Sequence, residues 1–174
     1  MFGTLEQSDD GRWQVRFTRR LPHPIEKVWR AVTQPEHLAA WFPCTIDGER
    51  RAGAALTFRF DGDAEPMSGE MVVFDPPRCM ELRWGADVLR LELRPVPEGT
   101  ELQLIDTLEE LGKAARDAAG WHECLDRLTH AVAGEPVPFE LGAVWTETHP
   151  HYQERFGPEA STIGPPAGHA AAEG

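Results

Sequence analysis

Two acidic residues stand at positions where a carboxylate can bind a ligand or transfer a proton. Asp106 follows Leu102 and Leu104 at alternate positions of a strand-like segment and so shares their apolar face. Asp117 lies within the apolar stripe of a long helical segment. A carboxylate among apolar side chains has a raised pKa or pairs with a cation, and either state suits recognition or proton transfer. The alternative is that both reach water, Asp106 through a bulge and Asp117 as a first-turn acid that the helix dipole favours.

His122 is the histidine best placed to join these acids. It lies about 100° from Trp121 on a helical wheel, at the rim of the apolar stripe, where it can reach the mouth of a cavity. The alternative is a boundary histidine that titrates normally. His149 and His151 flank a proline and lack the third and fourth ligands of a stable metal site, so we expect loop histidines and no metal there. No residue is assigned a catalytic role, and no cofactor is expected.

The segments that must position these groups alternate apolar and polar residues with period two, as half-buried strands do. Short connections rich in Gly, Pro and Asp separate them, so sequence neighbours should pair antiparallel. The expected strands cover residues 13–20, 55–60, 69–74, 79–84, 88–94 and 101–108. One apolar face can be read from Met80, Leu82, Trp84, Leu89, Leu91, Leu93, Leu102 and Leu104.

Three segments instead show helical spacing. Pro24 and Pro35 are placed as first-turn prolines of two short helices, over residues 25–32 and 35–41. Residues 113–133 form a longer helix, because apolar residues recur every three or four positions along it. That stripe should cover the apolar face of the sheet. A short helical return is expected over residues 145–156.

Composition excludes several classes of function. The 174 residues include 29 acidic and 17 basic side chains, for a net charge of -12, so nucleic acid and anionic membranes are poor partners. The first residues lack a signal peptide, and no stretch has the ~20 apolar residues that span a bilayer, so we expect a cytoplasmic protein with no membrane partner. The three cysteines are far apart and are expected to be reduced.

The order of strand, two helices, antiparallel strands and long helix resembles the START-like (SRPBCC) superfamily, in the branch related to the activator of heat shock protein 90 ATPase. The stretches that carry the resemblance are PIEKVWRAVTQPEHL (24–38) with Trp41-Phe42, then GEMV (69–72) with DPPR (75–78) and LRW (82–84), and Gly120-Trp121 with Leu125 and Leu128. The first is fairly specific. The resemblance implies an α+β helix-grip fold, in which a curved antiparallel sheet wraps around the C-terminal helix and encloses a cavity.

We therefore expect a helix-grip domain over residues 12–134, a return segment over 135–157 and a disordered tail over 158–174. Its expected function is binding or carriage of a small apolar or aromatic molecule between helix and sheet. The expected ligand-binding residues are Trp41, Phe42, Met80, Leu82, Trp84, Leu91, Leu104, Asp106, Asp117, Trp121, His122 and Leu125. Trp41 and Phe42 stand where such cavities usually open, as a gate or as plain packing.

Two alternatives stay open. One is an enzyme of the cyclase, dehydratase or hydrolase type that uses cavity carboxylates or a histidine as acid and base. The other is a co-chaperone or protein-interaction module. A chaperone partner is not expected, because chaperone activators of this name carry a further N-terminal domain and the START-like part starts here at Trp13. A homodimer is left open.

Overall fold

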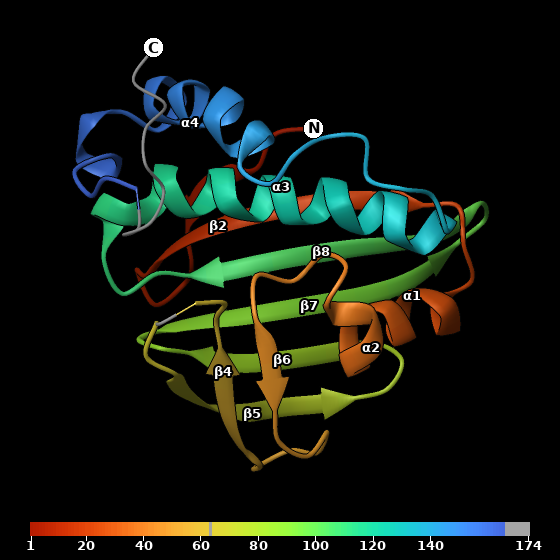
Figure 1. The fold of residues 1–174 in the computed structure, drawn as a ribbon. Helices are drawn as coiled ribbons and strands as arrows, with labels where there is room; N and C mark the ends of the chain where they lie inside the picture. Colours follow the sequence, from red (N-terminus) through yellow and green to blue (C-terminus); the bar gives the residue numbers. More distant parts are fainter. Residues whose placement is uncertain (63, 166–174) are drawn as a thin grey trace.

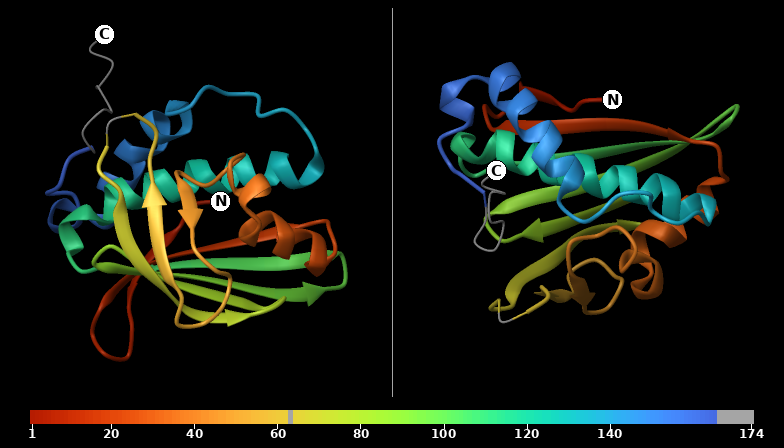
Figure 2. Two further views of the ribbon diagram at one scale, coloured as in Figure 1. Left: turned by 60° about the horizontal axis from the view of Figure 1, so that its bottom comes forward. Right: turned by 45° about the horizontal axis from the view of Figure 1, so that its top comes forward.

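The sheet is one continuous antiparallel layer in the computed structural model, which describes residues 1–62 and 64–165. Over these residues eight strands run in the spatial order β1-β2-β8-β7-β6-β5-β4-β3. The sheet curves so that its β3–β5 end rises around the long helix α3 (Figures 1 and 2). The strands are β1 (Thr4–Gln7), β2 (Trp13–Leu21), β3 (Thr45–Asp47), β4 (Ala55–Arg59), β5 (Met67–Asp75), β6 (Cys79–Trp84), β7 (Asp87–Val96) and β8 (Gly99–Thr107).

The helices lie on the concave side of this sheet. Two short ones, α1 (Ile25–Thr33) and α2 (Pro35–Leu38), follow β2, while the 3-10 turn η1 (Leu111–Lys113) leads into α3 (Ala114–Ala133). The helix α4 (Ala143–Phe156) then packs on the outer side of α3, and η2 (Pro158–Ala160) follows it (Figure 1). None of the helices in the described part of the chain has the length and apolar character needed to cross a membrane.

The strand register explains why one face of the sheet is apolar. Met80, Leu91, Leu104 and Phe17 lie side by side across β6, β7, β8 and β2, and each is at most 2% exposed. Because side chains alternate between faces, this pairing places the next inward row two residues further along each strand. The sheet thereby presents a concave apolar surface that must be covered.

Helix α3 covers that surface. Trp121, Leu125 and Leu128 recur on one side of the helix and belong to the same buried cluster as Leu82, Leu91 and Leu102 of the sheet. The helix ends at Ala133, and Gly134 follows with a φ of 71°, so that its N–H donates to the Ala131 carbonyl and the next N–H, of Glu135, donates to the His130 carbonyl. The α+β helix-grip fold that the sequence predicts is confirmed.

Several details differ from the sequence-based expectations. The edge strands β1 and β3 were not predicted, because each is only three or four residues long and shows little alternation. His149 and His151 lie inside α4 rather than in a loop, since the helix continues through Pro150. Disorder over 158–174 is wrong for residues 158–165, where Ala160 is buried and the Ile163 N–H donates to the Gly112 carbonyl. The rest of that expected tail lies outside the described residues.

We predict that Leu125→Ala lowers the free energy of unfolding by about 2–5 kcal/mol, because Leu125 is 1% exposed and its truncation leaves a void between α3 and the sheet. Urea denaturation followed by circular dichroism measures this. Thr129→Ala, one turn further along and exposed, is the matched control and should change stability by no more than about 0.5 kcal/mol. A small loss at Leu125 would indicate that α3 is not tightly packed there.

Candidate functional site

A cavity of about 400 Å³ opens at one end of the sheet, where the β6–β7 turn meets the first half of α3. The turn has only two residues, and Gly85 supplies the positive φ, 59°, that such tight hairpins need. It therefore holds Trp84 and Asp87 as a directly opposed pair at the cavity. The other walls come from α3, from Phe60 and Met67 near β4 and β5, and from the segment that leads into α4.

Aromatic rings form much of the cavity wall. Phe60, Trp84, Trp121 and Trp145 line it. The Trp84 ring lies 5.8 Å from the Trp121 ring and 5.9 Å from the Phe60 ring, centroid to centroid, in tilted and edge-on arrangements. Such arrangements are favourable for aromatic side chains and hold the rings in defined orientations. The wall is therefore preformed and can accept an apolar or aromatic body.

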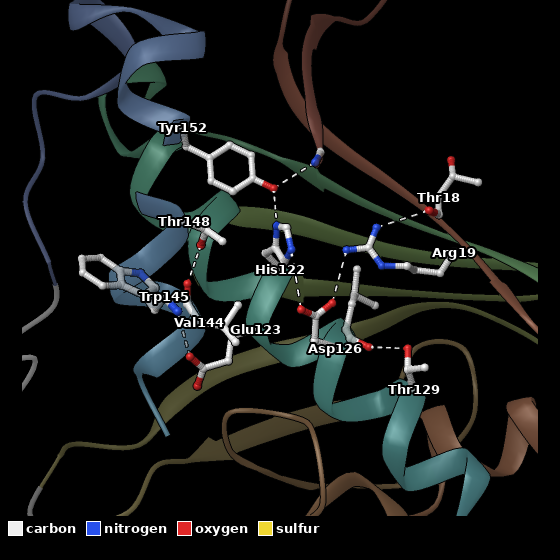
Figure 3. Close-up of polar contacts among 12 residues, drawn as sticks. Thr18, Arg19, His122, Glu123, Asp126, Thr129, Val144, Trp145, Thr148 and Tyr152 are labelled. Atoms are coloured by element: carbon white, nitrogen blue, oxygen red, sulfur yellow. Dashed lines mark hydrogen bonds and ion pairs between the residues drawn. The ribbon is translucent and has the colours of Figure 1, made fainter. Parts of the chain in front are cut away.

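The segment between α3 and α4 closes one side of the cavity through Glu123. This buried carboxylate accepts the N–H of Gly142 at 2.7 Å and of Trp145 at 2.9 Å, and so caps the N-terminus of α4. The indole N–H of Trp145 also donates to the Arg116 carbonyl at 3.1 Å. Figure 3 shows the Glu123 carboxylate next to the backbone nitrogen of Trp145. These bonds fix Trp145 and the neighbouring Leu141 against the cavity.

Three carboxylates meet at the base of the cavity. One oxygen each from Asp87, Asp106 and Asp117 lies within 4.8 Å of the others. Asp87 and Asp117 line the cavity, and Asp106 lies behind them in the inward row that Leu82, Leu89 and Val15 occupy on neighbouring strands. Asp106 thus interrupts an otherwise apolar row.

Asp106 is 1% exposed and only half satisfied. Its Oδ2 accepts the indole N–H of Trp121 at 2.9 Å, whereas its Oδ1 receives no hydrogen bond from any residue that the structure describes. Burial first, and then the nearby charges of Asp87 and Asp117, raise the pKa of Asp106 well above its usual value. The side chain is therefore a carboxylic acid that holds its proton more tightly than an exposed aspartate does.

The other two carboxylates have cationic partners. Lys113 Nζ lies 2.7 Å from Asp87 Oδ2, while Asp87 Oδ1 accepts the Glu109 N–H. Arg116 Nε donates to Asp117 at 2.7 Å, but burial still raises the pKa of Asp117. A divalent cation on this cluster would have to compete with Lys113 and Arg116, so the cluster is not a preformed metal site.

The cavity is also lined by a thiol, that of Cys124. Burial raises the pKa of this thiol to about 12, which is too high for a thiolate nucleophile.

Comparison with known proteins places the chain in a family. Residues 22–133 match the family described as Activator of Hsp90 ATPase homolog 1-like protein. The chain belongs to this family. Its START-like, helix-grip architecture supports a ligand-binding domain in general terms. No curated protein matches the sequence.

Solved structures share the fold of this family member. CalU16 from Micromonospora echinospora superposes with a TM-score of 0.70 at 23% identity, over 88% of this chain and 95% of its own. EF2215 from Enterococcus faecalis, titled a conserved protein of unknown function, gives 0.72 at 18% identity over 88% and 89%. NE0264 from Nitrosomonas europaea gives 0.61 at 19% over 70% and 94%. Identities this low establish the fold alone.

Apart from His122, the residues expected to bind a ligand separate into three groups in this family member. Trp84, Asp117 and Trp121 line the cavity, with Asp106 directly behind. Trp41 is 2% exposed and donates its indole N–H to the Ala31 carbonyl, while Phe42 packs on Trp84 and Trp121, so the expected gate is a packed corner here. The remaining apolar members lie in the core and do not line the cavity: Met80, Leu82, Leu91, Leu104 and Leu125.

His122 does not line the cavity, and its side chain lies between Tyr152 of α4 and Asp126 (Figure 3). Its Nδ1 lies 2.8 Å from the hydroxyl of Tyr152, which accepts the N–H of Gly3, and its Nε2 lies 3.6 Å from Asp126. Burial, followed by the charge of Arg19, lowers the pKa of His122 to about 4. It is therefore neither a cavity-mouth group nor a normally titrating boundary histidine, and it joins α3 to α4 and the N-terminus.

The cavity residues that the sequence reasoning missed include Asp87, Lys113, Arg116, Glu123 and Trp145, and weak signals exist for the first three. Asp87 continues the alternation of the inward residues of β7. Lys113 and Arg116 lie at helical spacing from Asp117 and Gly120. Glu123 and Trp145 could not be found this way, because their roles depend on how α4 folds back.

We predict that Asp106→Asn gains stability relative to the natural protein as the pH rises from about 4 to 8. The folded protein keeps the Asp106 proton above the pH at which the unfolded chain releases it, so this group lowers stability progressively with rising pH, by at most about 1.4 kcal/mol per pH unit. Asparagine removes that dependence. Urea denaturation of both proteins across the pH range measures the difference, and a constant difference would show that Asp106 ionises without penalty.

Proposed function

We propose that the protein binds a small apolar or aromatic molecule in the cavity beside Trp84 and Trp121. The observation that carries this proposal is a cavity of about 400 Å³ with four aromatic residues in its wall. Ligand sites typically measure about 300–1,000 Å³ and combine apolar walls with a few polar groups. A bicyclic or tricyclic ring system suits such a volume.

The polar groups gather at one end of the same cavity, which supports an oriented ligand. Asp87, Lys113, Arg116 and Asp117 lie at the base, and their ion pairs hold one another in place. An apolar body placed against the rings gains about 25 cal/mol per Å² of buried apolar surface. A polar substituent that faces the base then adds specificity through hydrogen bonds.

The carboxylates favour an enzyme as a second candidate. Asp106 and Asp117 both have raised pKa values, and a protonated and an ionised carboxyl group in close proximity can act as acid and base. The two candidates differ in what Asp117→Asn does. In an enzyme it lowers turnover about 10²- to 10⁴-fold with affinity nearly unchanged, whereas in a binding protein no turnover exists to lose.

Gly120 provides a direct test of the binding site. It lines the cavity from α3, and a Cβ added there would meet no atom within 4 Å. We predict that Gly120→Phe lowers the affinity for the neutral dye Nile red about tenfold or more, because the ring occupies the ligand's space. Fluorescence titration of the dye measures the dissociation constant.

Gly120→Ala is the matched control. Alanine should leave dye binding nearly unchanged and stabilise α3 by about 0.5–1 kcal/mol, because glycine is a poor residue inside a helix. Equal helical circular dichroism in both variants would show that the phenylalanine variant is folded. Unchanged dye binding to the folded Gly120→Phe variant would place the binding site elsewhere and contradict the proposal.

A further inference from the structure

The charged groups around the cavity do not balance. Among the residues that the structure describes, Asp87, Asp117 and Glu123 line it together with only two cationic side chains, Lys113 and Arg116. Asp106 adds a fourth carboxyl group directly behind the wall. The described residues in and behind the cavity wall therefore supply four acidic groups for two basic ones, in a protein whose net charge is already -12. An anionic ligand would be repelled both by the acidic groups at the cavity and by the net negative charge of the whole protein.

Both cations are also already engaged. Lys113 pairs with Asp87 at 2.7 Å, and Arg116 pairs with Asp117 at 2.7 Å. Glu123 is satisfied by the two N–H groups at the start of α4. The group left over is the Asp106 carboxyl, because its Oδ1 is buried and accepts no hydrogen bond from the described residues. When Asp106 is ionised, this oxygen is an unpaired buried acceptor, which favours a donor and above all a positively charged one.

The aromatic wall next to these acids suits the same kind of group. Trp84 and Trp121 line the cavity with ring centroids 5.8 Å apart, and Trp121 also holds Asp106 through its indole N–H. The faces of indole rings attract cations, most strongly where water is excluded. Rings and carboxylates together make the combination that recognises organic ammonium groups.

We propose that the ligand of this cavity is an aromatic or apolar amine, whose protonated nitrogen lies against the cluster of Asp87, Asp106 and Asp117 while its ring system lies among the tryptophans. The proposal rests on the proposed binding function and specifies the chemical class of its ligand. Asp87 and Asp117 face the nitrogen from the cavity wall beside their partners Lys113 and Arg116, and Asp106 adds negative charge from behind them once it is ionised.

Proton release follows from this arrangement. The groups that face Asp106 are Asp87 from β7 and Asp117, Lys113 and Trp121 from the α3 region. The two aspartates oppose its ionisation, and Lys113 and the indole N–H favour it. A bound ammonium group adds a further positive charge, which lowers the pKa of Asp106. A fraction of the protein molecules then lose the Asp106 proton when the amine binds. The affinity for the amine therefore rises with pH until Asp106 is ionised in the free protein.

Three probes with the same ring system test the charge preference: 2-naphthylmethylamine, 2-naphthylmethanol and 2-naphthoate. We predict that the amine binds about tenfold or more tightly than the alcohol at neutral pH and that the carboxylate binds most weakly. Isothermal titration calorimetry measures the three dissociation constants. Repeating the amine titration in two buffers of different ionisation enthalpy measures the protons released.

Asp106→Asn should reduce the preference for amine over alcohol about tenfold and lower the proton release to the part contributed by Asp117, whose pKa is also raised, with the affinity for the alcohol unchanged. Asp126→Asn is the matched control, because Asp126 lies on the same helix, is partly buried and does not line the cavity. It should keep both the preference and the proton release. Retained alcohol binding shows that each variant is folded.

The outcomes separate the two proposals. If the alcohol binds as tightly as the amine in the natural protein, the ammonium preference is wrong while the binding function stands. If none of the three probes binds, the binding function itself fails. If millimolar Ca²⁺ displaces the amine and binds alone with the same proton release, a metal ion replaces the organic cation as the occupant.

Discussion

The hydrogen bond between the Trp121 indole and Asp106 joins the long helix to the sheet at the point on which the site depends. Asp106 lies in a row that is otherwise apolar across four strands, so an ionised carboxylate there is costly. The indole N–H at 2.9 Å offsets part of that cost and fixes the orientation of the ring. Trp121 also lines the cavity, so this one hydrogen bond both holds the buried Asp106 carboxyl in place and helps to shape the cavity wall.

The same helix organises the two ends of the described chain through its opposite face. Glu123 caps α4 and brings Trp145 to the cavity, while His122 meets Tyr152, whose hydroxyl accepts the N–H of Gly3 (Figure 3). These buried polar groups are mutually satisfied, which makes the packing of α4 on α3 specific as well as favourable. The part of the cavity wall formed by the segment that leads into α4 therefore depends on contacts that lie outside the cavity. Substitutions among these buried polar groups should alter the shape of the cavity, even though His122 does not line it.

The position of the cavity sets limits on what it can bind. The middle of the sheet is filled by side chains from α3 and the inward rows, so the space lies at one end, beside the β6–β7 turn. That end concentrates carboxylates because the turn, the inward row of β8 and the first turn of α3 converge there. The proposed site gains selectivity in this way, with rings for the body of a ligand and acids for one substituent.

The sequence alone predicted the longer strands and helices and the resemblance to the family, though not the short edge strands β1 and β3, because periodicity and turn chemistry are local. The alternation through Leu102, Leu104 and Asp106 placed the acid on the inner face, and the spacing of Trp121, Leu125 and Leu128 defined the covering helix. What only the tertiary structure decided was which of these residues meet the cavity. Asp87 and Asp117 are 30 residues apart in the sequence, and Trp145 reaches the wall only because α4 folds back onto Glu123. The core leucines and the cavity rings have the same pattern in the sequence, since both are inward-facing. Whether space remains beside them depends on how the helix, the turn and the return segment pack together, which no local pattern encodes.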